Sequence, residues 1–280
     1  MEVTPIMKTF ENIINNVPKP KEDDYLGEDG LIYCSKCNTA KQCKIFIFGE
    51  ERIVPCICEC EKERLDKEEE ARKAQEKIAR VRELRKTGFP ESNMQEWTFA
   101  NDDMANPQIT RAMKRYSENF GELKKQGKGL LLYGNVGTGK TFAACEIANA
   151  LIDKGYPVLV TNFARLTNTI QGMYEGKQKY IDSLNQFDLL VIDDLGVERK
   201  SEFMQEMVYN IIDSRYRAGL PLIVTTNLTI NEIKTPNDIA NSRIYDRILE
   251  RCFPVEVAGQ SRRRKAVRES YNDMKDLLGL

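Results

Sequence analysis

The sequence contains no histidine, and this absence excludes two kinds of chemistry. Neither acid–base catalysis by an imidazole nor metal ligation by histidine is available to the 280-residue chain. Its net charge is only −1, so no global field attracts nucleic acid, and such a contact would have to use a local patch. Any catalytic or metal site must therefore be built from other side chains.

Long apolar runs are also missing. No stretch approaches the roughly 18 residues that a membrane-spanning helix needs. The first residues, Met1 to Pro5, have neither the basic segment nor the apolar segment of a secretory signal. We therefore expect a cytoplasmic protein without membrane contact. Thiols stay reduced in that compartment, so the eight cysteines require metal binding or core packing as explanations before disulfides.

The most specific pattern that is present has the form G-x-x-x-x-G-K-[ST]. Its members are Gly134, Asn135, Val136, Gly137, Thr138, Gly139, Lys140 and Thr141. An apolar run precedes the motif and a helical pattern follows it, as phosphate-binding loops require. Glycines allow backbone N–H groups to face phosphate oxygens, and the helix N-terminus adds partial positive charge. We predict a nucleoside-triphosphate site in which Lys140 contacts the β- and γ-phosphates and Thr141 contacts Mg²⁺.

Apolar strand patterns alternate with helical patterns after this motif. The strand patterns cover residues 156–161, 187–194 and 220–227, and each is a nearly continuous apolar run. Such runs are typical of strands that are buried on both faces. The alternation therefore predicts an α/β fold with a parallel sheet flanked by helices.

Two adjacent acids end the second strand pattern. Because ligands bind at the carboxyl ends of parallel strands, Asp193 and Asp194 are expected beside the phosphate-binding loop. Asp193 would hold Mg²⁺ through water, and Asp194 would act as the general base on the attacking water. Asn227 ends the next strand and would orient that water and sense the γ-phosphate. The guanine-specific motif N-K-x-D is absent, which favours ATP over GTP.

Six cysteines lie between residues 31 and 60 and predict a small zinc ribbon. They form a C-x-x-C pair, a lone cysteine after it, and a C-x-C-x-C cluster beyond a β-like segment. The predicted zinc ligands are Cys34, Cys37, Cys56 and Cys58, with Cys60 or Cys43 as an alternative. A module of about thirty residues cannot bury a sufficient core alone, which favours a bound metal. An iron–sulfur cluster is the less favoured occupant.

The patterns predict three segments. Residues 1–60 form an N-terminal arm, with a short helix possible over 6–15, and the cysteine-rich module. Residues 61–87 form a charged helical linker, and residues 88–280 form the nucleotide-binding domain. In the linker, Ile78, Val81 and Leu84 make a narrow apolar stripe that either packs or binds a partner, although a solvated helix is favoured.

Four motifs in this order resemble the DnaC/DnaI/IstB group of AAA+ ATPases. They are the loop at 134–141, the acidic strand at 190–196, the Thr-Thr-Asn at 225–227, and the segment 242–248 followed by 259–263. The resemblance covers about residues 88–270. It implies an AAA+ P-loop ATPase with a reduced C-terminal lid, which agrees with the short stretch of chain after Asn227.

The resemblance also assigns arginines. Arg247 matches the arginine finger, with Arg243 as a second candidate, and Arg263 matches the sensor 2 arginine, with Arg262 as a near alternative. A finger acts on the nucleotide of a neighbouring subunit, so hydrolysis would need self-association. Many AAA+ enzymes have glutamate where this chain has Asp194, and the shorter side chain is expected to slow hydrolysis.

By the same resemblance, the chain is similar to bacterial or phage helicase loaders. This resemblance implies that the protein loads a hexameric, DnaB-like replicative helicase onto single-stranded DNA in replication initiation. The implied cofactors are ATP, Mg²⁺ and Zn²⁺. The group contacts single-stranded DNA near residues 163–179, where Arg165, Lys177 and Lys179 accompany Phe163 and Tyr174. An ordinary surface helix is an equal alternative for that segment.

Three other functions remain open from the sequence. The first is an IstB-like transposition helper, and the cysteine module argues against it. The second is a nucleotide-gated adaptor for DNA or protein with little hydrolysis. The third is a small-molecule P-loop kinase, which the finger-like Arg247 and the ordered sensor motifs disfavour.

Overall fold

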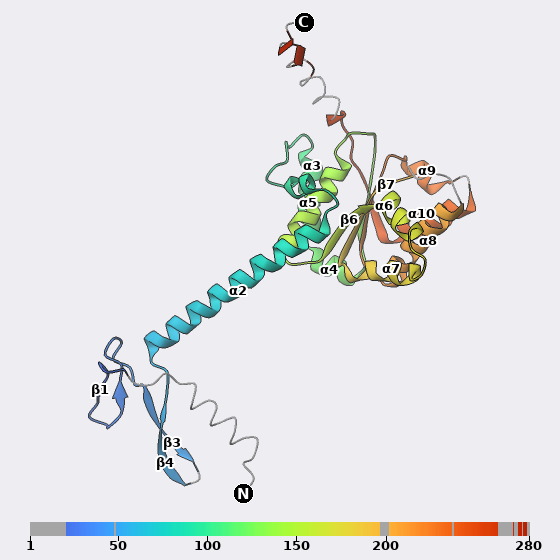
Figure 1. The fold of residues 1–280 in the computed structure, drawn as a ribbon. Coiled ribbons are helices and arrows are strands. Elements are labelled where there is room, and N and C mark those ends of the chain that lie inside the picture. The colour runs from blue at the N-terminus through green and yellow to red at the C-terminus, as the bar shows by residue number, and fades with distance from the viewer. Residues whose placement is uncertain are drawn as a thin grey trace. The chain divides into compact units, whose positions relative to one another are not determined.

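The computed structural model describes residues 21–47, 49–196, 202–236 and 238–262, with positions 271, 274–275 and 277–278. The predicted helix over 6–15, Phe48 and most of the segment after residue 262 lie outside these residues. The chain divides into two compact units, Met1–Lys77 and Ile78–Leu280, which are described separately below (Figure 1). Within the described part, no helix is both long and apolar enough to cross a membrane.

The first unit contains two small antiparallel sheets. One pairs β1 (Tyr25–Leu26) with β2 (Ile32–Tyr33), and the other pairs β3 (Gln42–Ile47) with β4 (Glu50–Pro55). Among the described residues of this unit, only Leu31, Cys34 and Cys58 are buried hydrophobic side chains. Isolated two-stranded hairpins are marginally stable in water, so these strands need another source of stability.

Helix α2 (Glu59–Gly88) starts in the first unit and ends in the second. Its first five turns are almost entirely exposed and carry ion pairs between residues three or four positions apart. Near its end, Val81 and Leu84 pack against the core of the second unit, whereas Ile78 remains 66% exposed. Gly88 lies so close to the backbone of β6 that a Cβ there would be 2.6 Å from the Val158 carbonyl oxygen.

The second unit is built on a five-stranded parallel sheet with the order β6-β7-β8-β5-β9. The strands are β5 (Gly129–Tyr133), β6 (Val158–Asn162), β7 (Leu189–Leu195), β8 (Leu222–Thr226) and β9 (Cys252–Glu256). The longer helices are α3 (Pro107–Glu118), α5 (Lys140–Asp153), α6 (Phe163–Gln171), α8 (Glu202–Arg217) and α10 (Ile239–Arg251). The shorter ones are η1 (Ser92–Glu96), α4 (Phe120–Lys125), α7 (Lys177–Ser183), η2 (Leu184–Gln186) and α9 (Ile230–Lys234).

Helices cover both faces of this sheet (Figure 1). Alternate side chains of β5 enter different cores: Leu130 and Leu132 pack with α3 and α5, and Leu131 packs with α6, α8 and α10. This alternation follows from the two-residue period of a strand, and it explains why the strands read as continuous apolar runs. The predicted α/β fold with a parallel sheet flanked by helices is confirmed.

The buried guanidinium of Arg215 connects three segments at the edge of the sheet opposite the carboxyl ends of its strands. It donates to the carbonyl of Pro221 (2.8 and 3.1 Å) and to those of Leu184, Phe187 and Asp188 at 3.4, 2.8 and 3.0 Å. Burial lowers the pKa of Arg215 to about 10, so the side chain stays charged at neutral pH. The carbonyls therefore solvate a cation that water does not reach.

Candidate functional site

The phosphate-binding motif forms the turn between β5 and α5. Its glycines Gly134, Gly137 and Gly139 have φ angles of 139°, 84° and 99°, which side chains other than glycine rarely adopt. At Gly134 a Cβ would also lie 2.7 Å from the carbonyl oxygen of Val257. The glycine spacing is therefore required by the backbone path that brings the loop to the N-terminus of α5, a favourable position for an anion.

Lys140 lies in the mouth of this loop and is almost fully buried. Its Nζ donates to the carbonyls of Gly134 (2.9 Å) and Asn135 (2.8 Å) and to Asn227 Oδ1 (2.8 Å). The sheet order explains the last contact, because β8 is the neighbour of β5 and both strands end at the same edge. The predicted phosphate-binding lysine and the predicted sensor asparagine are thus brought together.

Asp193 lies at the end of β7 and faces the first turn of α5. Thr141 Oγ1 donates to its Oδ1 (2.8 Å) and Oδ2 (3.1 Å), and Thr225 Oγ1 donates to Oδ1 (2.5 Å). Burial raises the pKa of the Asp193 carboxyl, and the hydrogen bonds from Thr225 and Thr141 oppose that rise. A hydroxyl and a carboxylate are the oxygen donors that Mg²⁺ prefers, so this pair fits the predicted metal.

Asp194 has a left-handed backbone with φ of 58°, although it is not glycine. Its N–H donates to Thr225 Oγ1 (2.9 Å), and its Oδ1 accepts a long hydrogen bond of 3.5 Å from Asn227 Nδ2. The amide of Asn227 therefore lies between Lys140 and Asp194. The predicted cation, acids and amide meet at one edge of the sheet.

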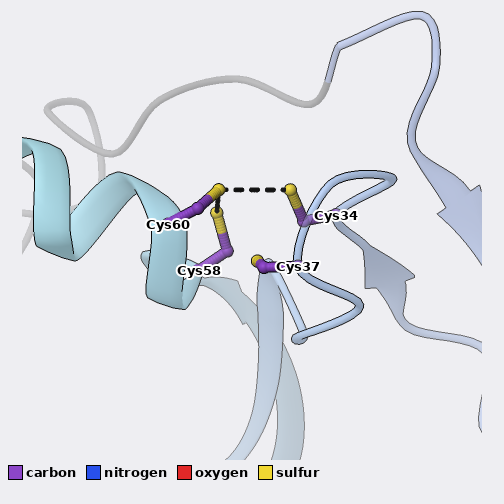
Figure 2. Close-up of side chains that lie close together, drawn as sticks. All are labelled: Cys34, Cys37, Cys58 and Cys60. Carbon is purple, nitrogen blue, oxygen red and sulfur yellow. Dashed lines mark hydrogen bonds between the residues drawn. The ribbon is translucent and has the colours of Figure 1, made fainter.

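Four cysteines of the first unit converge in space (Figure 2). The Sγ atoms of Cys34, Cys37, Cys58 and Cys60 all lie within 4.8 Å of one another. Cys60 Sγ is 3.6 Å from the sulfurs of both Cys34 and Cys58. Sulfurs at the corners of a tetrahedron around zinc, each about 2.3 Å from it, would be about 3.8 Å apart. The donor set and its spacing therefore fit Zn²⁺.

The structure places Cys60, the alternative ligand, in this cluster instead of Cys56. Helix α2 begins at Glu59, and its first turn directs Cys60 toward the C-x-x-C loop. Cys56 directly follows the β3–β4 hairpin. Its N–H donates to the Lys41 carbonyl, and its Sγ contacts the Ala40 carbonyl at 3.4 Å. The structure therefore corrects our assignment of Cys56 as a ligand. Cys60 takes its place because α2 starts at Glu59.

Polar groups support the cysteine cluster. The hydroxyl of Thr39 contacts Cys37 Sγ at 3.0 Å and accepts the Glu59 N–H at 2.9 Å, which ties the cysteine loop to the start of α2. The contact with Thr39 is the main reason why the pKa of Cys37 falls to about 6, which favours the thiolate that a metal ion binds. Beside the cluster, Lys41 and Asp24 form a buried ion pair at 2.5 Å.

A sequence model of the family described as IstB-like ATP binding protein matches residues 59–270, which is most of the chain. The protein belongs to this family. It is therefore an ATP-binding AAA+ protein. The resemblance inferred from the four motifs is confirmed.

Three relatives of this IstB-like protein are similar at moderate identity. The replicative helicase loader DnaI of Bacillus subtilis is 27% identical over 201 residues, covering 64% of this chain and 62% of DnaI. The replicative helicase loader DnaC of Buchnera aphidicola (subsp. Schizaphis graminum) is 28% identical over 145 residues, covering 50% and 56%. A candidate insertion-sequence ATP-binding protein of Sinorhizobium fredii is 28% identical over 152 residues, covering 52% and 50%. The chain spans less than two thirds of the length of each of these relatives.

Solved structures support the fold. A crystal structure of DnaI superimposes with a TM-score of 0.52 at 23% identity, covering 61% of this chain and 95% of that one. The structure of a candidate primosome component from Streptococcus pyogenes serotype M3 superimposes with a TM-score of 0.55 at 20% identity. The match covers 66% of this chain and 98% of that one. At such identities the likeness establishes the AAA+ fold and nothing further.

The two finger candidates of this IstB-like protein differ in their surroundings. Arg247 Nε pairs with the buried carboxylate of Asp213 at 2.8 Å, and a second nitrogen donates to the Tyr209 hydroxyl at 2.9 Å. Its guanidinium also lies over the rings of Tyr209 and Tyr216. Arg243 is exposed and its side chain makes no hydrogen bond or ion pair with another described residue. Arg247, the residue that matches the motif, is thus engaged within its own subunit.

Arg263, the predicted sensor 2 residue, lies outside the described residues. Its neighbour Arg262 is described and reaches the phosphate-binding loop: its N–H donates to the Gly137 carbonyl at 2.9 Å. The guanidinium of Arg262 lies over the Phe142 ring and pairs with Asp102 (3.6 Å) and Asp103 (3.2 Å). The near alternative therefore contacts the nucleotide loop through its backbone and a pair of acids through its side chain.

Sequence reasoning missed the acidic surroundings of Arg262. Glu146 of α5 is buried, and its Oε1 has no hydrogen-bond partner among the described residues. Burial, with Asp102 and Asp103 nearby, raises the pKa of Glu146 to about 8. No local pattern marks this cluster, because its members come from three distant parts of the chain.

The predicted DNA-contact segment forms α6, α7 and the connection between them. Phe163 is buried in the core, and Arg165 donates to the Pro90 carbonyl at 3.3 Å. Tyr174 is fully exposed, and Lys177 lies over the Phe203 ring. Lys179 is exposed as well. The structure thus removes Phe163 from any stacking surface and leaves Tyr174 as the aromatic side chain accessible to a base.

Proposed function

We propose that this protein is an ATP-dependent loader that places a hexameric, DnaB-like replicative helicase on single-stranded DNA during replication initiation. The observation that carries the proposal is the extent of the match with the helicase loader DnaI, which covers 64% of the chain. The match with the insertion-sequence protein covers 52%. Loading of this kind takes place in the cytoplasm.

The proposed reaction is hydrolysis of ATP, with roles given by the geometry at the end of the sheet. Lys140 would bind the β- and γ-phosphates, and Thr141 and Asp193 would hold Mg²⁺. When bound, Mg²⁺ would neutralise charge on the phosphates. Asp194 would accept the proton of the attacking water, and Asn227, which contacts both Lys140 and Asp194, would orient it.

We further propose that hydrolysis requires self-association, with an arginine of one subunit acting on the nucleotide of the next. Arg243 suits this role better than Arg247, because Arg247 is already paired with Asp213 while Arg243 is exposed on α10. Arg263 would contact the phosphates within its own subunit.

The four-cysteine cluster is proposed to hold one Zn²⁺ and so to fold the first unit. This unit would bind the helicase, and the segment with Tyr174, Lys177 and Lys179 would contact single-stranded DNA by stacking and charge. ATP binding would favour the grip on both partners, and hydrolysis would release them.

A capture experiment tests the partner. The tagged full-length protein is incubated with host lysate and ATP, and retained proteins are identified by mass spectrometry. We expect the replicative helicase, retained by the wild-type chain and lost with the zinc-site variant Cys60→Ser. Recovery of a transposase in place of a helicase would contradict the loader role.

ATP turnover, with and without single-stranded DNA, tests the enzyme. Lys140→Ala is expected to abolish turnover, because it removes the cation that would bind the β- and γ-phosphates. Lys125→Ala is the matched control, since Lys125 is an exposed lysine of the same unit whose ion pair is with Glu122. Full turnover in Lys140→Ala would disprove the mechanism.

A transposition helper is the second candidate, and the 28% identity with the insertion-sequence protein of Sinorhizobium fredii favours it. A nucleotide-gated adaptor with little hydrolysis is a third. The adaptor predicts that Asp194→Asn leaves both turnover and DNA binding at the wild-type level, whereas the loader predicts that turnover falls.

A further inference from the structure

Thr225 of β8 is fully buried and hydrogen-bonded to both acids at the end of β7. Its hydroxyl donates to Asp193 Oδ1 (2.5 Å) and accepts the backbone N–H of Asp194 (2.9 Å). One hydroxyl thus serves as donor to the first acid and as acceptor for the second.

The pairing of β7 with β8 is irregular at this point. Ile192 is opposite Val224, and the next pair is Leu195 opposite Thr226. Two residues of β7, Asp193 and Asp194, therefore face the single residue Thr225, which is the arrangement of a β-bulge. The left-handed backbone of Asp194, with φ of 58°, belongs to the same irregularity.

The bulge changes the direction of the second acid. In a regular strand, successive side chains point to opposite faces of the sheet, so two adjacent acids would point away from each other. Here Asp193 contacts Thr141 and Asp194 contacts Asn227, and both of these partners border the phosphate-binding loop. The bulge therefore makes two neighbouring carboxylates available to the same ligand.

A left-handed conformation is less favourable for a residue other than glycine, and it persists where the surroundings support it. We propose that Thr225 is the positioning residue that provides this support, and that its hydroxyl fixes the directions in which Asp193 and Asp194 point. The inference rests on the proposed ATP hydrolysis. It assigns Thr225 no contact with substrate; its effect passes through the two acids.

The side chain must be a hydroxyl for this task. Valine has the shape of threonine but can neither donate to Asp193 nor accept from Asp194, whereas serine keeps both functions. Thr141 also donates to Asp193, but the same Thr141 hydroxyl is the proposed ligand of Mg²⁺. Thr225 is then the hydroxyl that remains available to hold Asp193.

The next residue provides a matched control. Thr226 is equally buried, and its hydroxyl donates to the Leu195 carbonyl (2.7 Å) and accepts the Leu228 N–H (3.1 Å). It supports the same strand end with the same two kinds of hydrogen bond, but neither bond involves an acid. Thr226→Val therefore shows what loss of a buried hydroxyl does to the fold alone.

The experiment compares Thr225→Val, Thr225→Ser and Thr226→Val in the full-length protein. Melting temperature reports the fold, binding of a fluorescent ATP analogue reports affinity, and steady-state turnover reports kcat. For Thr225→Val we expect nucleotide affinity within about threefold of wild type and kcat lower by roughly 10- to 100-fold, the range expected from misplacement of a catalytic group. Thr225→Ser and Thr226→Val should keep kcat within about threefold of wild type.

A fourth measurement separates this inference from the proposed hydrolysis. The Mg²⁺ concentration that half-saturates analogue binding should rise several-fold in Thr225→Val and stay unchanged in Thr226→Val, even if the wild-type protein hydrolyses no ATP. Absence of turnover in the wild type would refute the hydrolysis alone. Equal losses of kcat in the two valine variants, or no shift in Mg²⁺ dependence, would overturn the role of Thr225.

Discussion

Different interactions stabilise the interior of each of the two units. In the second unit, apolar side chains fill a core on each face of the parallel sheet. In the described part of the first unit, only Leu31, Cys34 and Cys58 are buried hydrophobic residues, and two of them belong to the cysteine cluster. Apolar burial is the main favourable contribution to folding. We therefore expect the second unit to fold without a ligand and the first unit to need the metal ion that its cysteine cluster fits.

Disruption of the cysteine cluster is expected to have the largest effect. Cys60→Ser should lower bound zinc from about one ion per chain to near zero and unfold the first unit, because the described residues of that unit form no other core for its strands. Cys56→Ser is the matched control and should keep its zinc, since Cys56 lies outside the cluster. Elemental analysis measures the zinc, and limited proteolysis reports the fold.

The same substitution should leave the melting transition of the second unit unchanged. A common loss of both transitions would show that the two units do not differ as described. Loss of zinc in Cys56→Ser, with retention in Cys60→Ser, would restore Cys56 as the ligand.

Within the second unit, substitutions of Arg247 and Arg243 on α10 should affect different properties, the first the stability of the fold and the second ATP turnover. Arg247→Ala removes one partner of the buried Asp213 carboxylate and should destabilise the fold by about 2–4 kcal/mol. Arg243→Ala should change stability by less than about 0.5 kcal/mol, as is usual for exposed positions, while reducing ATP turnover. Urea unfolding and turnover measure the two effects; a stable, inactive Arg247→Ala would favour Arg247 as the finger.

Glu146 should make the stability of the second unit depend on pH. Its pKa is about 8 in the folded chain and near 4.5 when unperturbed, so the folded chain binds more protons between these values. Stability should therefore fall as pH rises through this window and level off above it. Glu146→Gln should remove this fall and be more stable at pH 8.5 by about 2 kcal/mol, given about 1.4 kcal/mol per pKa unit and partial relaxation.

Melting temperatures at pH 5 and pH 8.5 test this effect. Glu122→Gln is the control, because Glu122 is an exposed glutamate of the same unit. An identical pH dependence in Glu146→Gln and the wild type would mean that Glu146 ionises normally in the fold.

The smallest effect is expected on the exposed part of α2. Glu69→Gln removes the surface ion pair with Lys73 and should lower helix stability only slightly, and less in high salt. Circular dichroism at low and high ionic strength measures the change. A loss of several kcal/mol would show that these ion pairs, and not zinc, hold the first unit.

The nucleotide loop could be predicted from the sequence because its physics is local. The glycines, Lys140 and Thr141 are close in the chain, and the strand before them and the helix after them are visible as patterns. Asp193 and Asn227 followed from the rule that parallel strands end at one edge. The bulge at Asp194 could not be predicted, because it depends on register with β8.

The fourth ligand of the metal site could not be predicted either, although the candidate cysteines are close together in the sequence. Three cysteines at 56, 58 and 60 are equivalent in spacing, and only the start of α2 decides between Cys56 and Cys60. Arg247 matches a motif, yet its partner Asp213 is 34 positions away in the chain. In each case an element boundary or a distant contact determines the outcome, and a linear pattern does not record it.

The position of Arg215 has a consequence for hydrogen exchange. One side chain holds carbonyls from the η2 turn, from the residues that precede β7 and from the turn before β8. Opening any of these segments would leave part of a buried cation without its acceptors. The amide protons of residues 184–188, 219–220 and 222 should therefore exchange with deuterium as a single cooperative unit, with one common free energy of opening.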